Sequence, residues 1–171
     1  MKLDSYVDFF RQTSPYIHKH RGKTFVIALD GDTVTHANFH RTIHDIALLQ
    51  SLGIRIVLVH GGRLQIDQRI AQSGEQSQFH NQLRVTNTTA MQSVKEALGS
   101  TRWQIEAELS TGLPNSPMHG AKIKAIGGNF ITAKPIGILN GVDYQHTGEV
   151  RGIDDESIQQ HLQLGGLVLI S

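Results

Sequence analysis

The sequence predicts an α/β fold, a three-layer α/β/α sandwich around a mainly parallel sheet that is incomplete at its C-terminal end. Short apolar runs at residues 25–29 and 167–170, and a run at 54–59 interrupted only by Arg55, are typical of strands that are buried on both faces. The first two runs are each followed by a polar, glycine-containing turn and then by apolar residues at helical spacing. The order strand–loop–helix thus occurs twice in succession, which indicates parallel strands joined by right-handed crossovers.

The composition fits one ordinary globular domain and excludes several other classes of protein. The chain has 171 residues, of which 39% are hydrophobic and 18% charged, which excludes a disordered or collagen-like chain. Its net charge of +1 supplies no strong field for nucleic acid or an anionic membrane, so we expect neither as a partner. Because the chain contains no cysteine, disulfides, thiolate metal sites and cysteine nucleophiles are excluded.

The same chain gives no signal for a membrane or for export. A membrane-spanning helix needs about 20 apolar residues, and the longest apolar run, residues 25–29, is far shorter. The first residues lack the apolar stretch of a signal peptide. We therefore predict a cytoplasmic protein.

Residues 1–20 are predicted to form a helical arm that precedes the domain. Its apolar residues Leu3, Tyr6, Val7 and Phe10 fall at helical spacing. Ser14 followed by Pro15 is a pattern typical of a new helix start, which predicts a break between two helical pieces. An arm this apolar must be covered, either by its own domain or by a partner.

The segments between the first two strands and the last one are predicted from the spacing of apolar residues and from the positions of glycine and proline. A helix over residues 38–52 presents Phe39, Ile43, Ile46 and Leu49 on one face and ends at Gly53, and a second helix over 64–73 ends at Gly74. The polar residues 75–82 indicate a loop. The remaining predictions are helices over 88–98 and 102–110 separated at Gly99, a turn at 113–117, short strands at 123–126, 130–133, 142–144 and 149–150, and a helix that begins at Asp154 and ends near Leu164.

The final apolar run, followed directly by Ser171, predicts that the chain is a truncated piece of a longer protein. A fold built from strand–helix units is unfinished at this point, with no helix to cover the strand. The alternative is that residues 167–170 are a legitimate last strand of a small α/β protein.

The turns after the first two strands are the best candidates for a ligand site. Ligands of open parallel sheets bind beyond the carboxyl ends of the strands, where Gly31 and the sequence His60-Gly61-Gly62 lie. Glycine lets backbone amides approach an anion closely, and the N-terminus of the following helix adds a partial positive charge. The alternative is that these glycines only form tight turns. Arg63 either holds an anion or is simply solvated.

Metal binding is not predicted. His36, His40 and His44 are four residues apart, and histidines at this spacing share one helix face. However, Phe39 and Ile43 mark the buried face, and no glutamate is in register to complete a zinc site.

The strand and turn from Val57 to Arg63, together with Arg84-Val85-Thr86, resemble the amino-acid kinase family. Within it the chain is most similar to the kinase-like domain of bacterial N-acetylglutamate synthases. The resemblance covers nearly the whole chain. Its further stretches are residues 15–17, 20–27, 52–55, 65–67, 128–131 and 141–144.

The resemblance argues against phosphoryl transfer. The family's kinases use a lysine on the first strand followed by paired glycines, and here those positions hold Ala28 and Asp30-Gly31. A carboxylate and a methyl group cannot supply the positive charge that a transferring phosphoryl group needs. The rival interpretations are nevertheless an acetylglutamate kinase and a non-catalytic small-molecule-binding half-domain.

The resemblance implies a regulatory and oligomerising role. The synthases transfer an acetyl group from acetyl-CoA to L-glutamate in the first step of arginine biosynthesis and are inhibited by L-arginine. The acetyl transfer belongs to a C-terminal acetyltransferase domain, which residues 21–171 do not include. The resemblance therefore implies that this fragment has no catalytic residues, no cofactor of its own and no activity alone, and that it forms a homo-oligomer through the N-terminal helix.

Two further residues are implied by the resemblance. Tyr16 on the N-terminal helix is a candidate effector contact, with packing between helix and domain as its alternative. Arg84 matches the family's arginine that meets the substrate carboxylate, a role that suits a guanidinium group. The alternative for Arg84 is an ion-paired or surface arginine.

Overall fold

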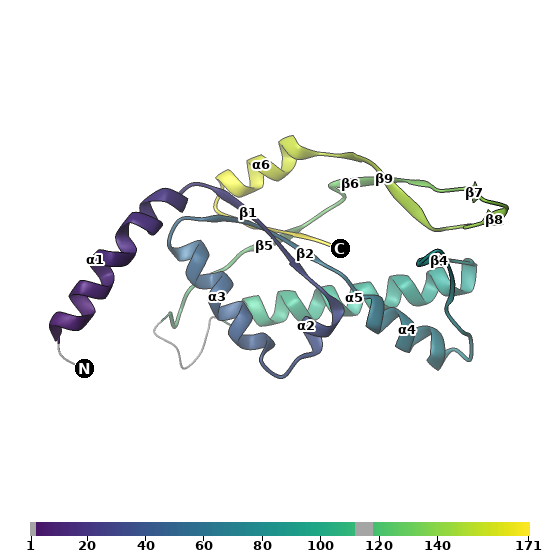
Figure 1. The fold of residues 1–171 in the computed structure, drawn as a ribbon, viewed down its shortest axis with the longest axis horizontal. Helices are drawn as coiled ribbons and strands as arrows, with labels where there is room; N and C mark the ends of the chain where they lie inside the picture. Colours follow the sequence, from purple (N-terminus) through teal and green to yellow (C-terminus); the bar gives the residue numbers. More distant parts are fainter. Residues whose placement is uncertain (1–2, 112–117) are drawn as a thin grey trace.

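The structure is a computed structural model that describes residues 3–111 and 118–171 (Figure 1). Its centre is a four-stranded sheet in the order β1 (Thr24–Leu29), β2 (Arg55–His60), β10 (Leu167–Ile170) and β5 (Ala125–Gly127). All neighbouring strands in this sheet are parallel. The predicted fold class is confirmed. Strands β1, β2 and β10 begin and end within about one residue of their expected positions, whereas β5 begins two residues later than predicted.

Alternate residues of the central strands build two separate layers of core. Leu58 and Leu169 point to the face that is covered by α3 (Phe39–Ser51) and α5 (Thr88–Ser110). Val57 and Val168 pack on the opposite side against α6 (Asp155–Gln163). The three layers follow from this alternation, because the apolar residues of β2 and β10 are buried on both faces of the sheet.

Strand β1 lies at one edge of the sheet and is covered on one face only, so the expectation that residues 25–29 are buried on both faces is wrong. Leu29 is buried, whereas Val26, on the other face, keeps 69% of its surface exposed. Its hydrogen-bonding partner in the sheet is β2, with Thr24 opposite Arg55 and Leu29 opposite His60.

The N-terminal arm is one continuous helix, α1 (Leu3–His20), so the predicted break at Ser14 is wrong. Pro15 lies inside the helix, where its ring removes one backbone hydrogen bond. The exposed position of the helix leaves the freed carbonyl group to water, and the Ser14 hydroxyl donates to the Phe10 carbonyl at 2.9 Å. Figure 1 shows α1 projecting from the body, and its side chains Phe9 and Phe10 are 65% and 64% exposed, so it does not dock on its own domain.

Helix α5 is also continuous, although two helices separated at Gly99 were predicted. Ala97 and Thr101 on either side of Gly99 are buried against the body, and this packing outweighs the cost of about 1 kcal/mol for glycine in a helix. The predicted turn at 113–117 lies outside the described residues. A short helix that the sequence did not reveal, α2 (Gly31–Thr35), follows β1.

Residues 75–82 are not only a loop, because they contribute to a hairpin of β3 (Gln78–His80) and β4 (Leu83–Val85). This hairpin follows α4 (Arg63–Gln72). Its two-residue turn places Asn81 and Gln82 at φ of 48° and 66°. The sequence signal was weak, because such turns usually carry Asn-Gly and this one has glutamine at the second position.

Replacing Gln82 with glycine is expected to stabilise the hairpin by up to about 1 kcal/mol, since a side chain in the left-handed region costs about 1–2 kcal/mol and the glycine loses part of that gain as backbone entropy. Urea unfolding and hydrogen exchange of residues 78–85 measure the change. The matched control is Gln82→Ala, which keeps a Cβ at the same positive φ and should gain nothing. An equal gain in both variants would show that backbone strain is not the cause.

The segment between β5 and α6 forms an extended ribbon. Strand β6 (Ile131–Pro135) pairs antiparallel with β9 (Gly148–Ile153), and the tip is a small hairpin of β7 (Ile138–Leu139) and β8 (Val142–Asp143). We call residues 131–153 the strap. Figure 1 shows the strap leaving the sheet beyond β5 and reaching to β4. The prediction of short strands here is confirmed. Strands β6 and β9 are longer than expected, β8 is one residue shorter, and β7 was not predicted.

None of the helices within the described ranges combines the length and the apolar composition that crossing a bilayer requires.

Candidate functional site

The predicted glycine turns meet at the carboxyl edge of the sheet. His60 is the register partner of Leu29, and the Gly61 amide donates to the Leu29 carbonyl at 2.8 Å. The backbones of Gly61 and Asp30 are therefore neighbours. The structure thus brings together Gly31, His60, Gly61 and Gly62, with Arg63 beginning α4 beside them.

Asp30 gives this edge a fixed negative charge. Its Oδ1 accepts hydrogen bonds from the Thr33 amide at 2.8 Å and the Thr33 hydroxyl at 2.5 Å, which makes it the N-cap of α2. These hydrogen bonds, first that from the hydroxyl, hold the pKa of Asp30 below its usual value. The carboxylate is consequently ionised at neutral pH, one residue beyond the strand that carries Ala28.

Close packing explains two of the glycines without a bound anion. A Cβ on Gly31 would lie 2.3 Å from Gln65 Oε1, and one on Gly62 would lie 2.7 Å from Leu98 Cδ2. The Gln65 side chain also donates from Nε2 to the Gly31 carbonyl at 2.8 Å. Gln65 on α4 therefore ties the two turns together, and the absence of a Cβ at Gly31 and Gly62 leaves room for the ends of the Gln65 and Leu98 side chains.

His60 is a buried, neutral link between two strands. Only 2% of its surface is exposed, and its Nε2 lies 2.8 Å from the Ser171 hydroxyl at the end of β10. Burial lowers the pKa of His60, and the charge of Arg102 lowers it further, against a hydrogen bond with the Gly61 carbonyl that raises it. The ring therefore joins β2 to β10 as an uncharged group at neutral pH.

Arg84 is engaged by the chain itself. Its Nη1 donates to Asp67 Oδ1 at 2.7 Å and to the Ser77 hydroxyl, which in turn donates to the same carboxylate oxygen. The guanidinium groups of Arg84 and Arg63 each lie 4.7 Å from the centre of the Phe79 ring. We call Arg63, Asp67, Ser77, Phe79 and Arg84 the Arg84 cluster. Two roles were considered for Arg84, a contact with the substrate carboxylate and an ion pair or surface position. The contacts described here are those of an ion-paired arginine.

The Asp67 carboxylate is ionised in this cluster. Partial burial raises its pKa, but the hydrogen bonds from Arg84 and Ser77 and the charges of Arg84 and Arg63 outweigh burial and hold the pKa below its usual value. The Arg84 side chain is 11% exposed and that of Asp67 38%, so the pair is sheltered mainly on the arginine side.

Tyr16 does not belong to this group of residues. It lies on α1 with 68% of its surface exposed, and Figure 1 places α1 at the opposite end of the molecule from β4. The structure thus separates the candidate effector contact from the glycine turns and from Arg84.

The sequence pattern missed Gln65, Asp67 and Ser77 as partners of the candidate residues. One signal was available, because Arg63 and Asp67 are four residues apart on a predicted helix and such a pair faces one another. No spacing rule connects Asp67 with Arg84, or Gln65 with Gly31, since the fold alone brings them together.

Within residues 3–111 and 118–171, no group of three or more histidine, aspartate or glutamate side chains is arranged to hold a metal ion. His40 and His44 contact each other edge to face, with ring centres 6.0 Å apart, and His36 Nδ1 accepts from the Asn38 amide at 3.1 Å.

Comparison with known proteins places these features in a family. The sequence model of the amino acid kinase family matches residues 23–171. An amino-acid acetyltransferase of Azotobacter vinelandii is 49% identical over 169 residues, which are 99% of this chain and 39% of the relative. The chain therefore spans about two fifths of the length of this curated relative.

Solved structures agree with the sequence comparison. N-acetylglutamate synthase from Neisseria gonorrhoeae, complexed with coenzyme A and L-arginine, matches 96% of this chain and 39% of its own, with a TM-score of 0.84 and 33% identity. The same synthase complexed with coenzyme A and N-acetyl-glutamate gives a TM-score of 0.83 and 32% identity.

Proposed function

Because the chain belongs to the amino acid kinase family, we propose that it is the first part of the kinase-like regulatory domain of an N-acetylglutamate synthase. The observation that carries the proposal is the 49% identity to an amino-acid acetyltransferase across 99% of the chain. The complete protein would transfer an acetyl group from acetyl-CoA to L-glutamate in the cytoplasm, as the first step of arginine biosynthesis.

The residues at the carboxyl edge support a regulatory rather than a kinase role. Phosphoryl transfer needs positive charge next to the moving phosphoryl group. Here the ionised Asp30 follows Ala28, and the Thr33 hydrogen bonds fix the carboxylate at the start of α2. A polyphosphate at this position would be repelled at short range.

We assign the remaining roles by region. Residues 1–20 form an arm for assembly into a homo-oligomer, and residues 21–171 begin the regulatory domain. L-arginine is the effector, as the arginine complex of the gonococcal synthase supports, and Tyr16 is the candidate contact on the arm. The glycine turns with Arg63 form the ligand-facing edge of the sheet, and acetyl-CoA is used outside these residues.

The test uses the complete protein that contains this chain. Acetyl transfer is followed by release of the coenzyme A thiol from acetyl-CoA in the presence of L-glutamate, with and without L-arginine. In parallel, release of ADP from ATP is measured with N-acetyl-L-glutamate. We expect acetyl transfer that L-arginine inhibits, and no phosphorylation above the background without protein.

The second candidate, an acetylglutamate kinase, makes the opposite prediction. ATP-dependent phosphorylation of N-acetyl-L-glutamate without acetyl transfer would replace our proposal with that one. Acetyl transfer that L-arginine leaves unchanged would retain the synthase and remove the regulatory role.

A further inference from the structure

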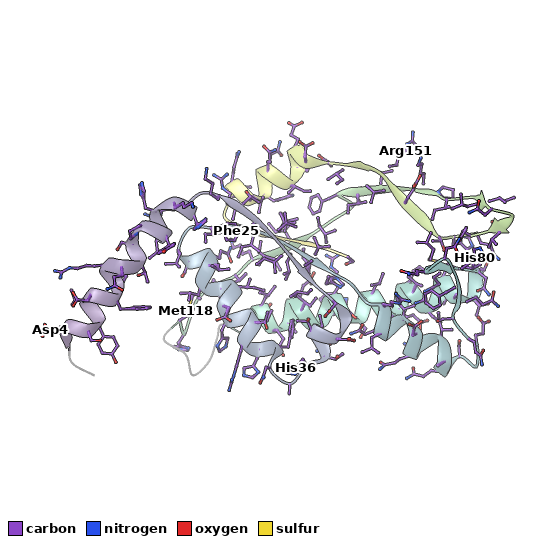
Figure 2. The ribbon with its side chains drawn as sticks, in the orientation of Figure 1. Asp4, Phe25, His36, His80, Met118 and Arg151 are labelled. Carbon is purple, nitrogen blue, oxygen red and sulfur yellow. The ribbon has the colours of Figure 1, made fainter. Side chains whose placement is uncertain are left out.

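The tip of the strap, together with residues 144–147 that follow β8, is fastened to the β3–β4 hairpin and the start of α5 by polar contacts. At α5 the His146 Nε2 lies 3.3 Å from the Thr88 hydroxyl. The His146 amide donates to the Thr86 carbonyl at 3.0 Å, and the Thr147 hydroxyl donates to the Arg84 carbonyl at 2.5 Å. The hydroxyl of Tyr144, a fully buried side chain, donates to the His80 carbonyl at 3.2 Å. Figure 2 shows His80 beneath the tip of the strap, at the end of the molecule opposite Asp4.

The base of the strap is fixed in a different way. Phe130, just before β6, is buried with Ile158, Leu162 and Val168 in the core below α6. The Asp154 amide, just after β9, donates to the Phe130 carbonyl at 2.8 Å. Apolar packing therefore holds the base, whereas the tip is held by the contacts with residues 80–88.

Neither the strap nor the hairpin has a core of its own. Every residue of β9 is exposed, as are most of those of β6. In the hairpin, Phe79 and Leu83 remain 40% and 41% exposed. Segments with so little apolar burial open at a low free energy unless specific polar contacts hold them.

Arg84 is the residue at which α4, the β3–β4 hairpin and the strap meet. Its side chain pairs with Asp67 on α4, its ring contact is Phe79 on β3, and its carbonyl accepts from Thr147 of the strap. Within the described residues, the pair with Asp67 is the salt bridge that joins the hairpin to α4. Two weaker contacts accompany it, the hydrogen bond from Ser77 to Asp67 and the approach of Arg63 to the Phe79 ring.

We propose that the Asp67–Arg84 ion pair is a latch that holds the β3–β4 hairpin and the tip of the strap to α4 as one unit. While the latch is closed, Tyr144 stays buried and the strap bridges from β5 to β4. When the ion pair opens, the hairpin loses its salt bridge to α4. The strap, which is fastened to the hairpin, then moves with it, while the base of the strap stays fixed.

The latch is tested by hydrogen exchange and mass spectrometry on the complete protein at neutral pH. The variant Asp67→Asn keeps the size of the side chain and removes its charge. We expect backbone amides in both residues 78–86 and 142–148 to exchange about tenfold faster or more, because the hydrogen bonds from Arg84 and Ser77 to residue 67 are no longer assisted by its charge. Amides of β2 serve as the internal reference and should not change.

The matched control is Glu96→Gln. It removes the charge from an exposed ion pair that also involves α4, in which Arg69 of α4 lies 2.8 Å from Glu96 of α5. It should leave both segments at the parent rate. A second variant, Thr147→Val, cuts the strap from Arg84 without touching the ion pair, so it should accelerate residues 142–148 alone.

Three results would overturn the latch. Asp67→Asn could leave residues 142–148 at the parent rate, which would mean that the strap is independent of the ion pair. It could accelerate β2 by the same factor, which would mean global unfolding. Thr147→Val could release both segments equally, which would make the strap the anchor of the hairpin.

Discussion

Replacing Phe9 and Phe10 together with serine is expected to lower the assembled mass of the protein by about twofold or more without loss of the fold. The two rings are 65% and 64% exposed on a helix that projects from the body, and Tyr6 and Val7 beside them are 55% and 43% exposed. Such a contiguous apolar patch is unfavourable in water unless another surface covers it. Since the arm does not dock on its own domain, a second copy of the chain is the partner that we propose.

Light scattering coupled to size-exclusion chromatography measures the mass, and circular dichroism checks the fold. The matched control is Asp8→Ser on the same helix, because the Asp8 side chain is 65% exposed and its ion pair with Arg11, at 3.4 Å, lies on the helix surface. Its assembled mass should equal that of the parent. An unchanged mass for the double variant, or for a chain that lacks residues 1–20, would remove the arm from the assembly.

Replacing Leu58 with alanine is expected to destabilise the domain by about 2–5 kcal/mol. Leu58 is fully buried in β2, between Ile27 of β1 and Leu169 of β10 in the sheet register. The substitution removes buried methyl groups and leaves a cavity that flanking strands cannot fill without breaking their pairing. Because a domain is stable by only about 5–15 kcal/mol, this is a large fraction of the whole.

The measurement is the unfolding midpoint in guanidinium chloride, followed by circular dichroism. Leu48→Ala is the matched control, because the same atoms are removed from α3 where 46% of the side chain surface is exposed. Its cost should stay within about 0.5 kcal/mol. Equal losses in the two variants would contradict the assignment of Leu58 to the centre of the core.

The parallel sheet could be predicted because its strands carry a strong local signal. Runs such as Ile56-Val57-Leu58-Val59 are apolar at every position, which is typical of a strand covered on both faces. The predictions of the helix ends were wrong at Pro15 and Gly99. Proline and glycine there indicated breaks, but both helices are continuous. In α5 the burial of Ala97 and Thr101 decides the outcome, and burial is a tertiary property that the local sequence does not carry.

The position of the candidate site could be predicted from the sequence, but the side chains that contact it could not. The turns after the strands had to meet at one edge, because parallel strands end together. That Gln65 and Leu98 fill the space beside Gly31 and Gly62 could not be read from spacing, since these partners come from two different helices. The Asp67–Arg84 pair was hidden for the same reason, because its two residues are 17 positions apart.

The uncovered edge strand β1 has a consequence for handling the protein. Its sequence, Thr24-Phe25-Val26-Ile27-Ala28-Leu29, contains no charge and no proline, and an edge strand offers unpaired backbone groups to any other strand. Short segments of this composition are those that stack into cross-β aggregates. In a preparation of residues 1–171, the exposed edge of β1 can therefore pair with the same edge of other copies. The rate of aggregation on storage is expected to depend on protein concentration more than on the thermal stability of the core.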